Sequence, residues 1–435
     1  MAFSKDFLIG AATAAHQVEG NNIHSDYWAQ EHMPHTSFSE PSGEACDHYH
    51  RYEEDIRLLA EAGLNAYRFS VEWARIEPEE GRFDESEIEH YRQVIACCKR
   101  YGVEPVVTLL HFTSPVWLIR KGGWEAESTV EDFRRYAAYV TEQLGSELNV
   151  ICTINEANMG LQIAAIAKRY QLMAAQAAKA AAAAPKGEGS DGKVQVGINL
   201  EKMMENRKLA AMENAAVFGT PQPQIFVGAR TPEGDTLVMR AHQAAKEAIK
   251  ARFPQMKVGL TLSLHDIQAV PGGEEAAAAA WDEEFAHYLP YLQGDDFLGV
   301  QNYTRSQYGP QGQLPAPEGA ELTQMEYEFY PAALGHVIRR VHEAFAGDLV
   351  VTENGVATAD DTRRVAFIDE ALAGVQACVE DGIPVKGYFY WSLLDNFEWQ
   401  KGFSMMFGLI GVDRTTQERS PKPSLKKLGS YKRIE

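Results

Sequence analysis

Two glutamates at the ends of β-rich runs carry the most distinctive chemistry in this sequence. Glu156 ends the run NVICTINE, and Glu353 lies in DLVVTEN just before an Asn-Gly turn signal. Because valine, isoleucine and threonine favour strands, both carboxylates should lie where a strand meets a loop. Paired carboxylates across a cleft can hydrolyse a glycosidic bond, since one protonates the leaving oxygen and the other attacks or stabilises the oxocarbenium-like centre. Either glutamate alone could equally cap a turn or pair with an arginine.

The elements that must position these glutamates repeat along the chain. Short β-rich runs alternate with segments of helical period, two of which end at Gly63 and Gly102. The runs cover residues 7–13, 66–71, 105–111, 149–156, 257–265, 296–304, 348–354 and 385–395. Eight strand–helix units predict an α/β fold, a single-domain (β/α)8 TIM barrel over residues 1–435. Glu156 and Glu353, on the fourth and seventh strands, would then face each other across the C-terminal mouth.

One long segment interrupts this alternation after the fourth strand. We expect an insertion or extended loop at approximately residues 160–236, with an alanine-rich helix at 174–184 and a flexible connector, KGEGSDGK. The run VQVGINL within this segment could equally be a barrel strand, which would shift the numbering of the later strands.

Composition excludes several classes of protein. A formal net charge of −20 disfavours nucleic acid and anionic membranes, and no apolar run reaches the roughly 18 to 20 residues of a membrane span. The N-terminus does not resemble a secretory signal, so we expect a cytoplasmic location. The five cysteines have no CxxC spacing, which predicts buried, reduced thiols. No pattern identifies an oligomer interface.

A group of histidines near the N-terminus raises the alternative of a metal site. The group comprises His24, His32, His35, Cys46, His48 and His50. It has no regular ligand spacing, so we expect neither a metal nor a cofactor. Aromatic residues also gather at the predicted strand ends, where they would suit sugar rings: Trp117, Trp124, Tyr303, Trp391 and Trp399. Ordinary core packing is the alternative for Trp117.

Six segments together resemble glycoside hydrolase family 1, the β-glucosidase and β-galactosidase family. They are FLIGAATAAHQVEG, ACDHYHRYEEDI, NAYRFSVEWARI, TINEAN, TENG and GYFYWSLLDNFEW. The resemblance covers nearly the whole chain. It implies a retaining β-glycosidase that releases terminal β-D-glucosyl, or related β-D-galactosyl or fucosyl, residues from a small β-glycoside or short oligosaccharide.

The resemblance also implies a role for individual residues. Glu156 corresponds to the general acid/base and Glu353 to the nucleophile, with Arg68 and Tyr303 beside the nucleophile. The positions that hold the non-reducing sugar are Gln17, His111, Asn155, Glu398 and Trp399, with Trp391 as the platform beneath it.

Departures from the family pattern leave alternatives open. Ala157 stands where the family usually has proline, Gln301-Asn302 replaces Asn-Tyr, and Phe-Thr-Ser follows His111. A 6-phospho-β-glycosidase would need cations around the phosphate, and Lys401 is its one support, whereas Glu398 would repel the phosphate. A catalytically inert sugar-binding barrel is disfavoured because both carboxylates are present. An endo-acting glycanase would need an open groove.

Overall fold

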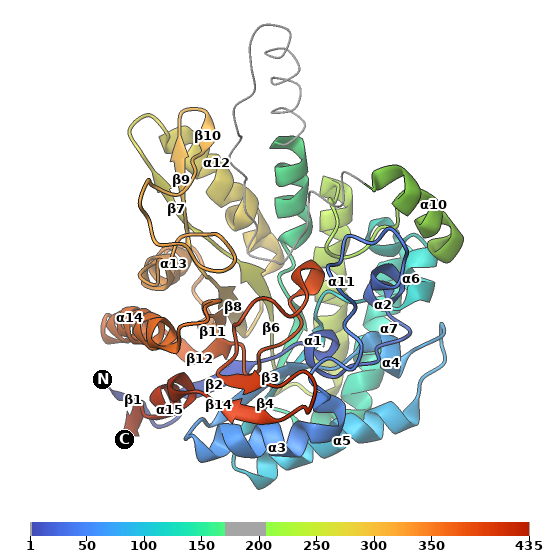
Figure 1. Cartoon of the computed structure of the whole chain (residues 1–435), viewed down its shortest axis with the longest axis horizontal. Helices are drawn as coiled ribbons and strands as arrows, with labels where there is room; N and C mark the ends of the chain where they lie inside the picture. Colours follow the sequence, from blue (N-terminus) through green and yellow to red (C-terminus); the bar gives the residue numbers. More distant parts are fainter. Residues whose placement is uncertain (1, 170–205, 435) are drawn as a thin grey trace, which may run out of the picture.

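Eight parallel strands form a closed barrel at the centre of the protein (Figure 1). The computed structural model describes residues 2–169 and 206–434. The barrel strands are β2 (Leu8–Ala12), β3 (Ala66–Ser70), β4 (Glu104–Leu110), β5 (Val150–Ile154), β6 (Lys257–Ser263), β8 (Phe297–Gln301), β11 (Asp348–Asn354) and β12 (Val385–Trp391). They pair in chain order, and β12 closes the barrel against β2. All eight predicted barrel strands and the (β/α)8 fold are confirmed.

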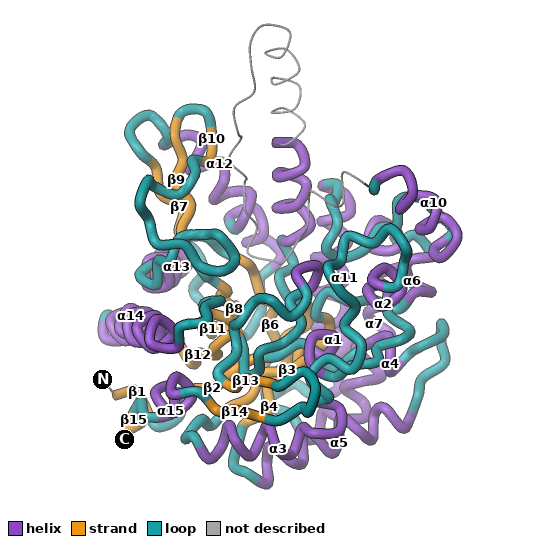
Figure 2. The backbone as a smooth tube through the Cα atoms, in the orientation of Figure 1, coloured by secondary structure: helices purple, strands orange, loops and turns teal. Residues whose placement is uncertain are grey.

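Helices surround the barrel, as the tube in Figure 2 shows. They include α3 (His48–Glu61), α5 (Glu85–Arg100), α7 (Ser128–Leu144), α11 (Pro232–Arg252), α12 (Glu274–Glu284), α13 (Ala333–His342) and α14 (Asp361–Glu380). Gly63 and Gly102, just beyond α3 and α5, have φ angles of +101° and +69°. Only glycine adopts such angles without steric cost, so both helices end where the sequence predicts.

The strands are buried on both faces, as expected for a parallel sheet covered by helices. Every residue of β3 and β8 is buried, including polar Arg68 and Gln301. A buried arginine requires partners that satisfy its charge and hydrogen bonds, which places polar chemistry inside the barrel.

Further strands and helices lie outside the barrel sheet. They are β1 (Ala2–Ser4), β15 (Lys432–Ile434), the pair β13 (Ile410–Val412) and β14 (Arg419–Pro421), the sheet of β7 (Asp266–Ala269), β9 (Arg305–Gly309) and β10 (Gly312–Gln313), and helices α1 (Ala15–Val18), α2 (Asp26–Glu31), α4 (Trp73–Ile76), α6 (Val116–Arg120), α10 (Arg207–Phe218) and α15 (Pro423–Gly429). Because β1 pairs with β15, the two ends of the chain lie together (Figure 1).

The region predicted as an insertion is described in part. Residues 159–169 are helical, α10 begins at Arg207, and α11 begins at Pro232 with Thr231 as its N-cap. The alanine-rich run, the KGEGSDGK connector and VQVGINL lie outside the described residues. The limits of 160–236 therefore stay a prediction.

Two further expectations concern the chain as a whole. All five cysteines are buried and free, as predicted. Among the residues described, no helix combines the length and apolar character that crossing a bilayer requires.

Candidate active site

The two glutamates meet in one cavity at the mouth of the barrel. Glu156 follows β5 and Glu353 lies near the end of β11, and each is only 3% exposed. The described residues that line the cavity are His111, Phe112, Asn155, Glu156, Tyr303, Glu353, Trp391, Glu398, Trp399 and Phe407. Arg68 and Gln17 do not line it, but both hydrogen-bond to glutamates that do. The structure thus brings every predicted site residue together.

Glu353 is held by two strong donors. Arg68 Nη1 lies 2.6 Å from Oε1, and the Tyr303 hydroxyl donates to Oε2 at 2.6 Å. Burial raises the pKa of Glu353, while the charge of Arg68 and these two hydrogen bonds oppose the rise. Both contacts stabilise the ionised carboxylate, because charge-assisted hydrogen bonds favour the charged form.

Glu156 has a contrasting environment. Burial raises its pKa well above the usual range, and the negative charge of Glu353 adds to this rise. A hydrogen bond from the Ser263 side chain opposes it. No salt bridge joins Glu156 to another described residue. Of the two carboxyl groups, Glu156 therefore retains its proton to higher pH, and pairs of acids driven apart in this way divide the acid and base roles between them.

The backbone around Glu156 is anchored to β6. Glu156 has a φ of +45°, a left-handed conformation that is costly for a non-glycine residue and that collects at functional sites. Its N–H donates to the Thr261 hydroxyl at 2.9 Å, and the Ala157 N–H donates to the Thr261 carbonyl at 3.0 Å. Proline, which the family usually has after this glutamate, could not make the second hydrogen bond.

Asn155 links the nucleophile side of the cavity to His111. Its Oδ1 accepts from Arg68 at 2.5 Å and from Gln301 at 2.8 Å, and its Nδ2 lies 3.2 Å from His111 Nε2. Burial and the charge of Arg68 lower the pKa of His111 well below its usual value. Since the neutral ring accepts at Nε2, Nδ1 carries the proton, and it has no partner among the described residues. It is available to donate to a hydroxyl group of a ligand.

A second group of site residues, the Gln17 group, comprises Gln17, Glu398 and Trp399. Gln17 Nε2 donates to the Phe397 carbonyl at 2.6 Å and to Glu398 Oε2 at 3.2 Å. Trp399, with a φ of +46°, stacks parallel to His16 with ring centroids 6.0 Å apart. Helix α1 thus positions both Glu398 and Trp399, because the residues that contact them, Gln17 and His16, are consecutive in it.

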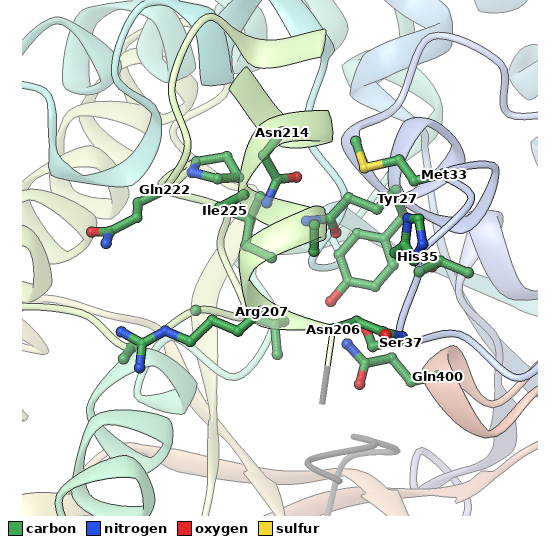
Figure 3. A pocket seen from close by; sticks show the side chains of 18 of the residues that line it. Tyr27, Met33, His35, Ser37, Asn206, Arg207, Asn214, Gln222, Ile225 and Gln400 are labelled. Carbon is green, nitrogen blue, oxygen red and sulfur yellow. The ribbon is translucent and has the colours of Figure 1, made fainter. Parts of the chain in front are cut away.

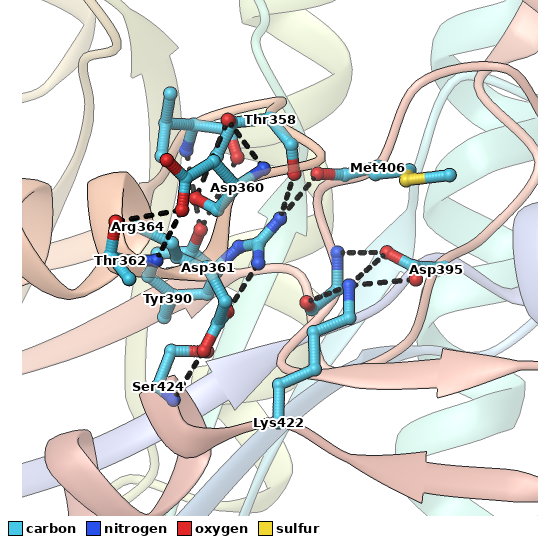
Figure 4. A network of polar contacts seen from close by, with 12 residues as sticks. Thr358, Asp360, Asp361, Thr362, Arg364, Tyr390, Asp395, Met406, Lys422 and Ser424 are labelled. Carbon is cyan, nitrogen blue, oxygen red and sulfur yellow. Dashed lines mark hydrogen bonds and ion pairs between the residues drawn. The ribbon is translucent and has the colours of Figure 1, made fainter.

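A polar network holds the segment that follows Trp399 and contains Met406 and Phe407 (Figure 4). The buried Arg364 of α14 donates to the carbonyls of Thr358 at 2.5 Å and Met406 at 2.7 Å. Lys422 contacts Asp395 at 2.7 Å. Thr358 belongs to the loop after Glu353, so one guanidinium joins that loop to the segment that carries Phe407 into the cavity.

Two residues that line the cavity were not predicted, and two aromatic residues at predicted strand ends lie outside it. Phe112 and Phe407 line the cavity but were not predicted. Phe112 directly follows His111 at the end of a predicted strand, which could have indicated it, whereas Phe407 follows no predicted strand. Trp117 and Trp124 do not line it. Their indole nitrogens donate to the Glu77 carbonyl at 2.8 Å and to Ser114 Oγ at 3.0 Å, so both pack beside the barrel.

The N-terminal histidines take part in separate contacts. His48 Nδ1 lies 2.7 Å from Asp55, His35 Nδ1 lies 2.6 Å from Glu213, and His50 pairs with Asp47. Within residues 2–169 and 206–434, no three His, Cys, Asp or Glu side chains cluster in a way that could hold a metal ion.

A (β/α)8 barrel with two buried glutamates at its mouth is suited to glycoside hydrolysis, and comparison with known proteins specifies the family. The model of "Glycosyl hydrolase family 1" matches residues 1–175 and 300–433. The chain belongs to this family and is therefore an O-glycosyl hydrolase.

Individual relatives match over almost their whole length. A β-glucosidase of Agrobacterium sp. is 29% identical over 97% of this chain and 93% of its own. The crystal structure of β-glycosidase BGL167 is 46% identical, with a TM-score of 0.85, and the match covers 98% of this chain and 96% of that one. The apo structure of β-glucosidase 1317 is 41% identical, with a TM-score of 0.84 and 97% of each chain covered.

Proposed function

We propose that this enzyme is a retaining β-glycosidase that releases terminal non-reducing β-D-glucosyl, or related galactosyl or fucosyl, residues by double displacement. The observation that carries the proposal is the asymmetry of the two glutamates. Glu353 contacts Arg68 and Tyr303, which stabilise its charge, whereas burial and the charge of Glu353 keep Glu156 protonated. An ionised nucleophile beside a protonated acid is the arrangement that double displacement requires.

In the first step, a Glu353 carboxylate oxygen forms a bond to the anomeric carbon while the bond from that carbon to the glycosidic oxygen breaks. Glu156 gives its proton to the departing oxygen. In the second step, Glu156, now ionised, takes a proton from water, and the water oxygen displaces Glu353 from the anomeric carbon. Both carboxyl groups return to their starting protonation states, and the sugar keeps its configuration.

The remaining side chains would recognise the sugar. His111 Nδ1 and the oxygen of the Gln17 amide have no partner among the described residues, so both can bond to sugar hydroxyls. Glu398 can accept from two adjacent hydroxyls, and Trp391 offers a flat face to the ring. Glucose is supported as the sugar because the Agrobacterium relative is named a β-glucosidase.

The 6-phospho-β-glycosidase alternative lacks support in the cavity. Among its described lining residues there is no lysine or arginine, whereas Glu398 contributes a carboxylate. Lys401 is not among the lining residues either. A phosphate placed near Glu398 would meet a like charge with no compensating cation.

A screen of nitrophenyl β-glycosides, with and without a 6-phosphate, tests the proposed function directly. We expect cleavage of unphosphorylated glucoside, galactoside or fucoside, with kcat/KM for the 6-phosphate lower by about a hundredfold or more, the scale of an uncompensated like-charge contact. Preference for the phosphorylated substrates would support the alternative enzyme. No turnover of any substrate by the folded protein would support an inert sugar-binding barrel.

A change at Ser263 should alter the pH dependence. Its hydrogen bond lowers the pKa of Glu156, so Ser263→Ala should raise that pKa. Because Glu156 must be protonated to act as acid, activity is lost as pH rises through this pKa. The basic limb of kcat/KM should therefore move to higher pH by about one unit, the equivalent of a hydrogen bond to a charged group.

The control for this change is Ser424→Ala. Ser424 is also fully buried, and its hydroxyl donates at 2.7 Å to Asp361, remote from Glu156. The pH profile of this variant should match that of the wild type. A basic limb that Ser263→Ala leaves in place, or moves to lower pH, would contradict the assignment of Glu156 as the acid.

A further inference from the structure

A second, larger cavity lies beside the sugar site (Figure 3). It has a volume of about 370 Å³, within the range of small-molecule sites. Its walls come from α2 and the loop that follows, from α10 and residues 221–229, from the helical residues 159–169, and from Trp399 and Gln400. Figure 3 shows Tyr27, Met33 and His35 on one side of the cavity and Arg207 and Gln222 on the other.

The lining of this cavity is largely apolar and carries little charge. Met33, Ile163, Ile225 and Val227 contribute hydrocarbon surface. Although the chain has a formal net charge of −20, no aspartate or glutamate is among the described lining residues, and Arg207 is their only lysine or arginine. The cavity therefore favours a ligand that is neutral and mostly apolar, because burial of such surface is favourable and burial of an unpaired charge is costly.

Neutral polar groups are also present on the lining. The Tyr27 hydroxyl and the side-chain amides of Asn214 and Gln222 form no hydrogen bond with any described residue. Tyr27 is buried, so its hydroxyl is a fixed group rather than a mobile surface one. A phenol and primary amides both donate and accept, which suits hydroxyl groups on the ligand.

The cavity lies where the leaving group of the glycosidase reaction would go. Trp399 lines both this cavity and the sugar site. Ile163 lies about one turn into the helix that begins at residue 159, just after Glu156, so the helix that follows the proposed acid forms part of the wall. Since Glu156 would protonate the departing oxygen, the group attached to that oxygen extends from the Glu156 side of the sugar site.

Hydrogen bonds join two of the segments that form the cavity wall. His35 Nδ1 lies 2.6 Å from Glu213 Oε1, and the His35 N–H donates to Oε2 at 3.1 Å. These contacts tie the loop after α2 to α10. A rigid, ring-bearing ligand loses less conformational entropy on burial in such a cavity than a flexible ligand of the same size, and therefore fits it better.

From these observations we propose that the cavity binds the aglycone, and that this aglycone is a neutral, multi-ring, largely apolar group with hydroxyl substituents. The inference rests on the proposed β-glycosidase function and adds the class of substrate. It predicts a preference for bulky ring-bearing aglycones over single-ring ones with the same leaving chemistry.

Two β-glycosides of the sugar preferred in the nitrophenyl screen provide the test: the phenyl glycoside and the estradiol 3-glycoside. Both release a phenol, but only the second has a neutral four-ring aglycone with a further hydroxyl. We expect wild-type kcat/KM to favour the estradiol glycoside by about tenfold or more, the effect of a few contacts in an apolar pocket. Ala210→Trp, which fills the cavity from α10, should remove that preference and change phenyl glycoside turnover by less than about twofold.

The matched control is Ala215→Trp. Ala215 is exposed on the same helix and does not line the cavity, so this variant should keep the wild-type preference. Ala211→Trp provides a second filling variant if Ala210→Trp fails to fold. Equal turnover of both glycosides by the wild type, or a preference that survives in a folded filling variant, would overturn the aglycone site. If the wild type cleaves neither substrate nor any nitrophenyl glycoside, the proposed function itself fails.

Discussion

Glu353→Ala is expected to lower kcat for hydrolysis by on the order of 10⁵ to 10⁶, the scale seen when an enzyme loses its nucleophile. No covalent intermediate can form in this variant, because alanine offers no oxygen to the anomeric carbon. Added azide can occupy the vacated space beside Arg68, whose guanidinium lies 2.6 Å from Glu353 in the intact enzyme. Azide should then attack an activated nitrophenyl β-glycoside directly and give the α-glycosyl azide, identified by proton NMR.

The control for Glu353→Ala must separate loss of chemistry from loss of fold. Removing this carboxylate leaves the fully buried Arg68 without its ion-pair partner, a change that commonly destabilises by about 3 to 5 kcal/mol. Thermal unfolding should therefore be followed beside the kinetics, with Glu353→Gln as the variant that keeps the shape of the side chain. A folded variant that still hydrolyses at the wild-type rate would show that Glu353 is not the nucleophile.

The barrel was predictable because its strands have a simple physical origin. Parallel strands buried on both faces are nearly continuous apolar runs, such as PVVTLL and FLGV, and helices ending in glycine separate them. The same pattern placed Glu156 and Glu353 at strand ends, and the structure confirms that both line one cavity. The alternation of strand-like and helix-like segments was therefore enough to predict that both glutamates lie at the mouth of the barrel.

The parts that could not be predicted depend on contacts between distant segments. Thr261 anchors Glu156 from the next barrel strand, about a hundred residues away, and threonine is common in any strand. Phe407 lines the cavity next to Met406, whose carbonyl accepts a hydrogen bond from Arg364, 42 residues earlier in the chain. Trp124 does not line the cavity, and Trp117 packs outside it, as its alternative predicted, because an aromatic residue near a strand end can face either way and sequence spacing does not distinguish the two directions.

The site also shows why the roles of the glutamates follow from their surroundings rather than from their sequence neighbours. Each follows threonine or asparagine on a strand, so local sequence does not rank their pKa values. Arg68 comes from β3 and Tyr303 follows β8, and both contact Glu353. Only closure of the barrel brings these donors to one carboxylate and leaves the other without them.

Glu156→Ala should have a smaller effect that depends on the leaving group. The variant lacks the proton donor, so glycosides with poor leaving groups should be cleaved more slowly by on the order of 10² to 10⁴, the usual contribution of general acid catalysis. A nitrophenolate leaves almost unaided, so with that substrate the glycosyl-enzyme on Glu353 should still form and accumulate. Azide, which needs no base, should restore turnover and give the β-glycosyl azide.

The anomer formed with azide distinguishes the two variants. In Glu156→Ala the sugar is first inverted onto Glu353 and then inverted again by azide, whereas in Glu353→Ala a single inversion takes place. Opposite anomers are therefore expected from the same β-glycoside, and the wild type, which has both carboxyl groups, should give hydrolysis with little azide product. The same anomer from both variants, or an equal loss of activity by Glu156→Ala on good and poor leaving groups, would exclude Glu156 as the acid/base and Glu353 as the nucleophile.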